Sequence, residues 1–151
     1  MILERWRKLV WNIPFNGLSI TAGGIDTAAI LADPVLRRRV AELMAEVIQA
    51  AKACGYPLPE SAADEQMKRT ETMGAYKPST LVDFLAGRPL EIDAIWEEPL
   101  RRANAAGIAA PHLAKLCESL RALERKPSSR PAPHHEIAPD QSFQSSLEAR
   151  P

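Results

Sequence analysis

Three polar side chains near the amino terminus have the spacing of one helix face. Lys8, Asn12 and Asn16 are each four residues apart, so in a helix they form a line of roughly 12 Å, at about 1.5 Å rise per residue. An ammonium group and two amides in that line suit a small ligand with an anionic group or a carbonyl. A solvated polar face opposite a buried one is the simpler explanation of the spacing, although asparagine is a mediocre helix former. The spacing alone leaves both interpretations open.

A second group of polar residues follows a loop later in the chain. Ser79 and Glu91 are separated by one short predicted helix and its turn. A serine in that place can cap a helix, and a glutamate in a first turn can complement the helix dipole, so both have an ordinary structural alternative to ligand binding. Asp83 is equally a solvated charge, a local ion-pair partner or part of a site.

The elements that would position these residues are helices. Apolar residues recur at helical spacing through residues 1–126, and no segment has the Val/Ile/Thr-rich alternation of a strand. The sequence therefore predicts an all-α protein. Its helices are expected from about residue 3 to 20 and over 34–54, 61–73, 79–86, 90–106 and 111–125.

Prolines and capping residues predict where several of these helices begin. Asp33 is expected to be an N-cap with Pro34 at the first helical position. Pro14 lies inside the first helix and removes one backbone hydrogen bond, so a kink or restart is expected there, and Pro99 predicts the same in 90–106. Ser79 is expected to cap the short helix that follows it.

The first predicted helix is amphipathic. At about 100° per residue, its apolar face carries Leu3, Trp6, Leu9, Val10, Ile13 and Ile20. Its other face is expected in solvent and carries Glu4, Arg5, Lys8, Asn12, Asn16 and Ser19. The candidate ligand-binding line therefore belongs to the polar face of this helix.

The composition changes after Lys126. The last 25 residues contain five prolines and few large apolar side chains, so they cannot offset their ordering entropy. We predict one helical domain over residues 1–126 and a disordered Pro/Ser-rich tail over 127–151.

Length and charge exclude several classes of protein. A chain of 151 residues is about one domain, and 19 Lys+Arg against 19 Asp+Glu give no net field toward nucleic acid or an anionic membrane. No run of 18 apolar residues, metal-ligand spacing of histidines or glycine-rich phosphate loop occurs. We expect a cytoplasmic protein with no nucleic-acid, membrane or metal partner.

Two stretches resemble the C-terminal domain of ketopantoate reductase, also called 2-dehydropantoate 2-reductase. They are KLVWNIPFN over residues 8–16 and KPSTLVDFLAGRPLEIDAI over residues 77–95. The continuation over residues 99–111 is similar to the family's closing helices, and the resemblance covers about residues 3–124. It implies reduction of 2-dehydropantoate to (R)-pantoate with NADPH, a step of pantothenate and coenzyme A synthesis.

The resemblance also implies roles for the matching residues. Lys8 and Glu91 would be catalytic: Lys8 would protonate the ketone oxygen, and Glu91 would bind the substrate hydroxyl and orient Lys8. The substrate would be held by Asn12, Asn16 and Ser79. Asp83 would support these groups.

The resemblance does not extend to the nucleotide-binding domain of the family's proteins. That Rossmann half, with its glycine-rich loop, should precede Lys8, where this sequence has seven residues. We therefore expect no cofactor-binding residue in this chain, and a truncated or split reductase that is inactive alone and needs a separate Rossmann-domain polypeptide. The alternative is a non-enzymatic helical module that forms a homodimer or binds another protein through the face left uncovered.

Overall fold

The computed structural model describes residues 1–125, so the predicted disordered tail lies outside the described residues. The described part contains α1 (Leu3–Thr21), α2 (Thr27–Ala32), α3 (Pro34–Ala53), α4 (Ser61–Glu71), α5 (Ser79–Leu85), a π-helical turn η1 (Asp93–Glu97), α6 (Glu98–Ala105) and α7 (Pro111–Glu124). These residues include no strand, which confirms the all-α prediction.

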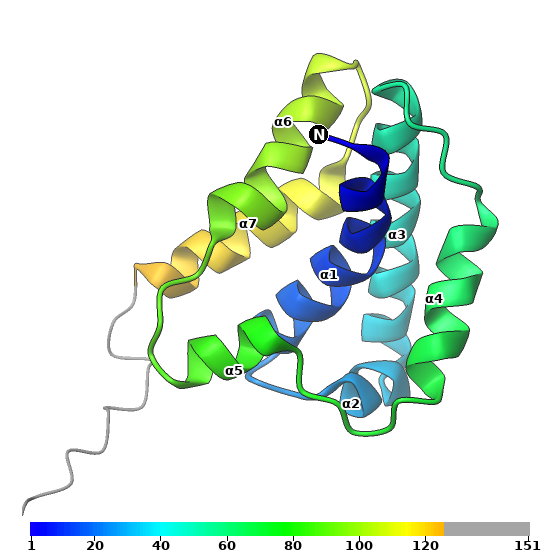
Figure 1. Ribbon diagram of the computed structural model, residues 1–151. Coiled ribbons are helices and arrows are strands. Elements are labelled where there is room, and N and C mark those ends of the chain that lie inside the picture. Colours follow the sequence, from blue (N-terminus) through cyan, green and yellow to red (C-terminus); the bar gives the residue numbers. More distant parts are fainter. Residues whose placement is uncertain (126–151) are drawn as a thin grey trace, which may run out of the picture.

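Helix α1 is the central element of the fold (Figure 1). It packs against α2, α3, α4, α5, α7 and η1. Every residue from Ile13 to Ile20 is therefore buried, whatever its type. The predicted polar face is correct at Lys8, which is exposed, but wrong at Asn16 and Ser19, because neighbouring elements surround the carboxyl-terminal half of the helix.

Local signals set several helix boundaries as predicted. The Asp33 side chain accepts hydrogen bonds from two backbone N–H groups in the first turn of α3, at 2.8 and 3.2 Å, and Pro34 begins that helix. Pro99 lies in the first turn of α6, where the α-helix resumes after η1. Helix α1 is continuous through Pro14, so the helix does not restart there, while the alternative of a kink at Pro14 stays a prediction. The short helix α2, capped by Asp26, was not predicted.

A buried carboxylate joins α3 to α7. Glu46 is 8% exposed, and its oxygens accept hydrogen bonds from the backbone N–H groups of His112 and Leu113, each at 2.9 Å. The His112 ring lies 2.7 Å from Glu46 through Nδ1 and 3.0 Å from Glu42 through Nε2. Glu46 thus satisfies the free amides that begin α7 and complements the dipole of that helix.

An ion pair between η1 and α7 gives the fold an acid-sensitive contact. The Arg121 guanidinium donates two hydrogen bonds to the Glu97 carboxylate, at 2.6 and 2.8 Å. This hydrogen bonding to Arg121, with help from Asp93, lowers the pKa of Glu97 from 4.5 to about 2. The carboxylate is 24% exposed, so water screens part of the interaction.

We expect this pair to make unfolding depend on pH. A carboxyl whose folded-state pKa is lowered stabilises the fold above its unfolded value, and this contribution is lost as the pH falls from about 4.5 to about 2. Glu97→Gln should remove about 1 kcal/mol at neutral pH and flatten that part of the pH profile. Urea unfolding at a series of pH values measures both, with Glu118→Gln, an exposed α7 acid that makes no ion pair within residues 1–125, as the control. An unchanged profile for Glu97→Gln would contradict the assignment.

Candidate functional site

Five of the six predicted site residues line one cavity. Its volume is about 490 Å³, and it lies where α1, α4, α5 and the segment leading into η1 meet. The predicted residues in its wall are Asn12, Asn16, Ser79, Asp83 and Glu91. The two polar groups that are far apart in the sequence therefore belong to a single site.

The sixth predicted residue, Lys8, lines an adjoining cavity of about 270 Å³. The two cavities share Trp11, Asn12 and Arg69 in their walls. The Lys8 side chain is exposed, and no hydrogen bond or ion pair joins it to Glu91. Lys8 thus lies at the outer end of a continuous polar region, and its ammonium is available to a ligand.

Asn16 is the most deeply buried polar residue of the site. It is 4% exposed, and its Oδ1 has no hydrogen-bond partner among residues 1–125. A buried acceptor without a donor costs about 1–3 kcal/mol. Asn16 lines the cavity, so a donor group of a bound molecule that reached this oxygen would remove the cost.

Ser79 does not cap the helix that follows it, so that prediction is wrong. The N-cap is Pro78, in an extended conformation, and Ser79 is already the first residue of α5. Its hydroxyl makes no hydrogen bond within the described part of the chain. The side chain is exposed in the wall of the cavity and is free to bind a ligand there.

The two carboxylates of the cavity differ in their surroundings. Asp83 forms an ion pair with Arg88, five residues further along the chain, so its charge is balanced locally. Glu91 is exposed, and its side chain has no partner among residues 1–125. Glu91 is therefore the carboxylate that can accept a hydrogen bond from a ligand.

Trp11, which lies in the wall that the two cavities share, belongs to an aromatic cluster. The Trp11 ring stacks on Phe15 with centroids 5.1 Å apart and meets Tyr76 edge-on at 6.2 Å. Its Nε1 donates to Thr70 Oγ1 at 2.9 Å, which ties α1 to α4. The remaining residues that line the larger cavity were not predicted from the sequence: Trp11, Arg69, Met73, Tyr76, Thr80 and Ile95. Three of them, Trp11, Thr80 and Ile95, lie within the two stretches that carry the family resemblance, whereas the other three lie outside both stretches and reach the cavity through helix packing.

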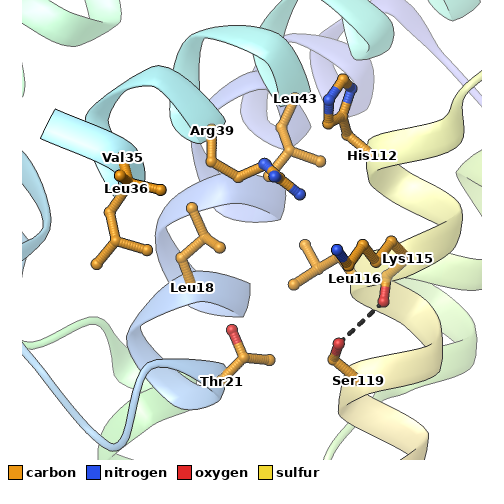
Figure 2. A pocket seen from close by; sticks show the side chains of 10 residues that line it. All are labelled: Leu18, Thr21, Val35, Leu36, Arg39, Leu43, His112, Lys115, Leu116 and Ser119. Carbon is orange, nitrogen blue, oxygen red and sulfur yellow. Dashed lines mark hydrogen bonds between the residues drawn. The ribbon is translucent and has the colours of Figure 1, made fainter.

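A different cavity lies between α1, α3 and α7 and holds none of the predicted residues. Figure 2 shows its apolar walls, with the side chains of Arg39, His112 and Lys115 at its edge. Ser119 Oγ donates to the Lys115 carbonyl oxygen at 3.1 Å, as the dashed line shows. Five of its ten lining residues are aliphatic, and it shares no residue with the two polar cavities.

The polar site can bind and orient a small anionic ligand and supply a proton. It has amide, hydroxyl, carboxylate and cationic groups on a helical scaffold. No three histidine, cysteine or acidic side chains of residues 1–125 gather as a metal site would require. None of the helices in this part of the chain is both long and apolar enough to cross a membrane.

The fold and this site define a helical domain with a polar cavity of a size that suits a small ligand. Residues 1–124 match the family model described as "Ketopantoate reductase PanE/ApbA C terminal". The chain therefore belongs to the ketopantoate reductase family and corresponds to the C-terminal domain, as its two motifs indicated.

Known relatives agree with this assignment. The chain is 38% identical over 124 residues to 2-dehydropantoate 2-reductase of Nostoc sp.. The matched region covers 82% of this chain and 39% of the relative. The crystal structure of 2-dehydropantoate 2-reductase from Methylococcus capsulatus is 38% identical, with a TM-score of 0.79 over 83% of this chain and 40% of that one. A dimeric ketopantoate reductase from Staphylococcus aureus is 26% identical, with a TM-score of 0.73 over 81% and 43%. The chain thus spans about 40% of the length of these relatives.

Proposed function

We propose that this chain is the substrate-binding and catalytic half of an NADPH-dependent 2-dehydropantoate 2-reductase, and that it does not turn over without a nucleotide-binding domain. The observation that carries the proposal is the cavity that gathers Asn12, Asn16, Ser79 and Glu91 next to Lys8. The proposal places the protein in pantothenate synthesis, with the cytoplasm as the expected compartment.

Each of these side chains has a chemical role in the proposal. The Lys8 ammonium donates a proton to the ketone oxygen and stabilises the negative charge that develops on it. Glu91 accepts a hydrogen bond from the substrate hydroxyl. Asn12, Asn16 and Ser79 fix the substrate so that one face of its ketone is presented, and Asp83, through its pair with Arg88, supports the wall.

The cofactor must be bound outside the described helices. NADPH supplies the hydride of such a reduction, and its diphosphate is ordinarily held by a strand, a glycine-rich turn and a helix. Residues 1–125 contain no strand, so they do not fit that cofactor by themselves. We therefore propose residues 1–126 as the substrate domain and a Rossmann-domain polypeptide as its partner.

Asn16→Leu tests the binding site directly. Leucine has the same branching as asparagine but no polar atom, so the variant should lose pantoate affinity by about 10-fold or more. It should also raise the free energy of unfolding by about 1 kcal/mol, because a buried acceptor without a partner is removed. Titration of the chain with pantoate followed by NMR, and urea unfolding, measure the two effects.

The matched control is Asn104→Leu, an exposed asparagine in α6. It should leave pantoate binding unchanged. If Asn16→Leu binds pantoate as tightly as the natural chain does, the cavity is not the substrate site.

Exposed apolar side chains favour the alternative of a self-associating or protein-binding module. Val82 and Leu85 are 47% and 38% exposed on α5, and Tyr76 is 43% exposed just before it. Apolar groups beside a ligand site are typical of a surface that another polypeptide covers. Analytical sedimentation distinguishes the proposals: a tight homodimer that ignores pantoate supports the alternative, and a monomer that binds pantoate supports the reductase half.

A further inference from the structure

Arg69 differs from most arginines of the described part of the chain. Arginines that contact a carboxylate there are Arg37, Arg39, Arg88, Arg101, Arg102 and Arg121. The Arg69 guanidinium makes no hydrogen bond or ion pair within residues 1–125. It lies in the walls of both polar cavities, so an unbalanced cation faces the proposed site from α4.

The backbone that carries Arg69 is held in place. The next residue, Thr70, is 1% exposed, accepts the hydrogen bond from Trp11 Nε1 at 2.9 Å and donates to the Gln66 carbonyl oxygen at 2.6 Å. Thr72 Oγ1 donates to the Arg69 carbonyl oxygen at 2.7 Å. This turn of α4 is thus fixed against α1 at Trp11, between Lys8 and Asn12 in the sequence.

No carboxylate among residues 1–125 forms an ion pair with Arg69. Glu71, two residues along α4, is occupied by Arg37 of α3. In the cavity itself, Asp83 is paired with Arg88 and Glu91 has no partner. A monoanionic ligand that enters beside Glu91 needs a cation to offset the repulsion between them, and the amide and hydroxyl groups of the cavity carry no charge.

We propose that Arg69 binds the carboxylate of the 2-keto acid substrate and selects for that free carboxylate; this inference rests on the proposed function above. In a 2-keto acid the carboxylate is bonded to the ketone carbon, so the groups that hold the two must be neighbours. Lys8, assigned to the ketone oxygen, and Arg69 both line the outer cavity, and Arg69 continues into the inner one with Asn16 and Ser79. The planar guanidinium matches a carboxylate through two parallel hydrogen bonds.

Two ligands that differ only in charge test this role on the full chain. Pantoate carries the carboxylate, and its primary amide is a neutral analogue of similar shape. Arg69→Gln should weaken pantoate binding by about 10-fold or more, since charge-assisted hydrogen bonds are lost. The same variant should change the affinity for the amide by less than about 2-fold, so that the preference for pantoate over the amide disappears.

Two further variants separate a specific contact from a general loss of positive charge. Arg69→Lys keeps a point charge without the planar fork and should recover part of the preference for pantoate. Arg38→Gln removes an exposed arginine of α3 that has no partner in the described part of the chain and lies outside both cavities, and it should change neither affinity. NMR titration of the four proteins at one fixed salt concentration gives all eight dissociation constants.

The outcomes distinguish this inference from the proposed function. If Arg69→Gln leaves pantoate binding unchanged, or weakens both ligands equally, the inference is wrong while pantoate binding by the natural chain still supports the substrate site. If the natural chain does not bind pantoate, the proposed function is rejected and the inference falls with it.

Discussion

Lys8→Ala is expected to lower the rate of 2-dehydropantoate reduction at least 10²-fold once this chain is supplied with the nucleotide-binding half of a family reductase. General acid catalysis by a positioned side chain contributes about 10²–10⁴-fold, and the ammonium also stabilises the developing alkoxide. Lys8 lies exposed at the outer cavity and has no side-chain partner within the described residues, so its removal leaves no lysine in the walls of the two polar cavities. The loss should fall mainly on kcat.

Absorbance of NADPH in the reconstituted mixture measures this effect. The chain alone should show no turnover, and Lys68→Ala, which removes an exposed lysine of α4 outside both cavities, should keep the full rate. Lys8→Arg separates two contributions, because arginine keeps the positive charge but does not release a proton at neutral pH. A reconstituted Lys8→Ala enzyme with an unchanged rate would rule out the proposed mechanism.

Much of the fold could be predicted from the sequence because some residues determine the structure of their own helical turn. Asp33 and Pro34 begin α3 because a side-chain cap and a fixed φ angle act within one turn. The four-residue spacing of Lys8, Asn12 and Asn16 similarly places them along α1 without knowledge of any other helix. Local chemistry therefore identified the line of candidate residues, though not its surroundings.

Burial and the remaining parts of the site depend on contacts between distant segments. Asn16 was expected in solvent, but α1 is surrounded by other elements at that point. Glutamate is usually exposed, but Glu46 is buried because it accepts hydrogen bonds from backbone N–H groups of α7, more than 60 residues away in the chain. Arg69 belongs to a helix with few large apolar residues, and only the packing of α4 on Trp11 brings it to the cavity.

The packing that holds these elements together depends strongly on one tryptophan of η1. Trp96 is fully buried, and its Nε1 donates to the Ile13 carbonyl oxygen of α1 at 3.1 Å. Gly17 of α1 makes room for it: a Cβ at that position would lie 3.0 Å from Trp96 Nε1 and 2.7 Å from a methyl group of Leu116. The ring therefore fills a space between α1 and α7 that exists because Gly17 has no side chain.

Trp96→Ala is expected to lower the free energy of unfolding by about 3–5 kcal/mol, since it removes a large buried ring and leaves a cavity. Trp96→Phe keeps most of the apolar volume but loses the hydrogen bond to Ile13, so its cost should be smaller, at about 1–3 kcal/mol. Urea unfolding of the two variants gives the difference. Because Ile95 and Glu91 lie in the wall of the polar cavity just before Trp96, the alanine variant should also lose pantoate affinity under conditions where it is still folded. An alanine variant as stable as the natural chain would show that η1 is not anchored to α1 through this side chain.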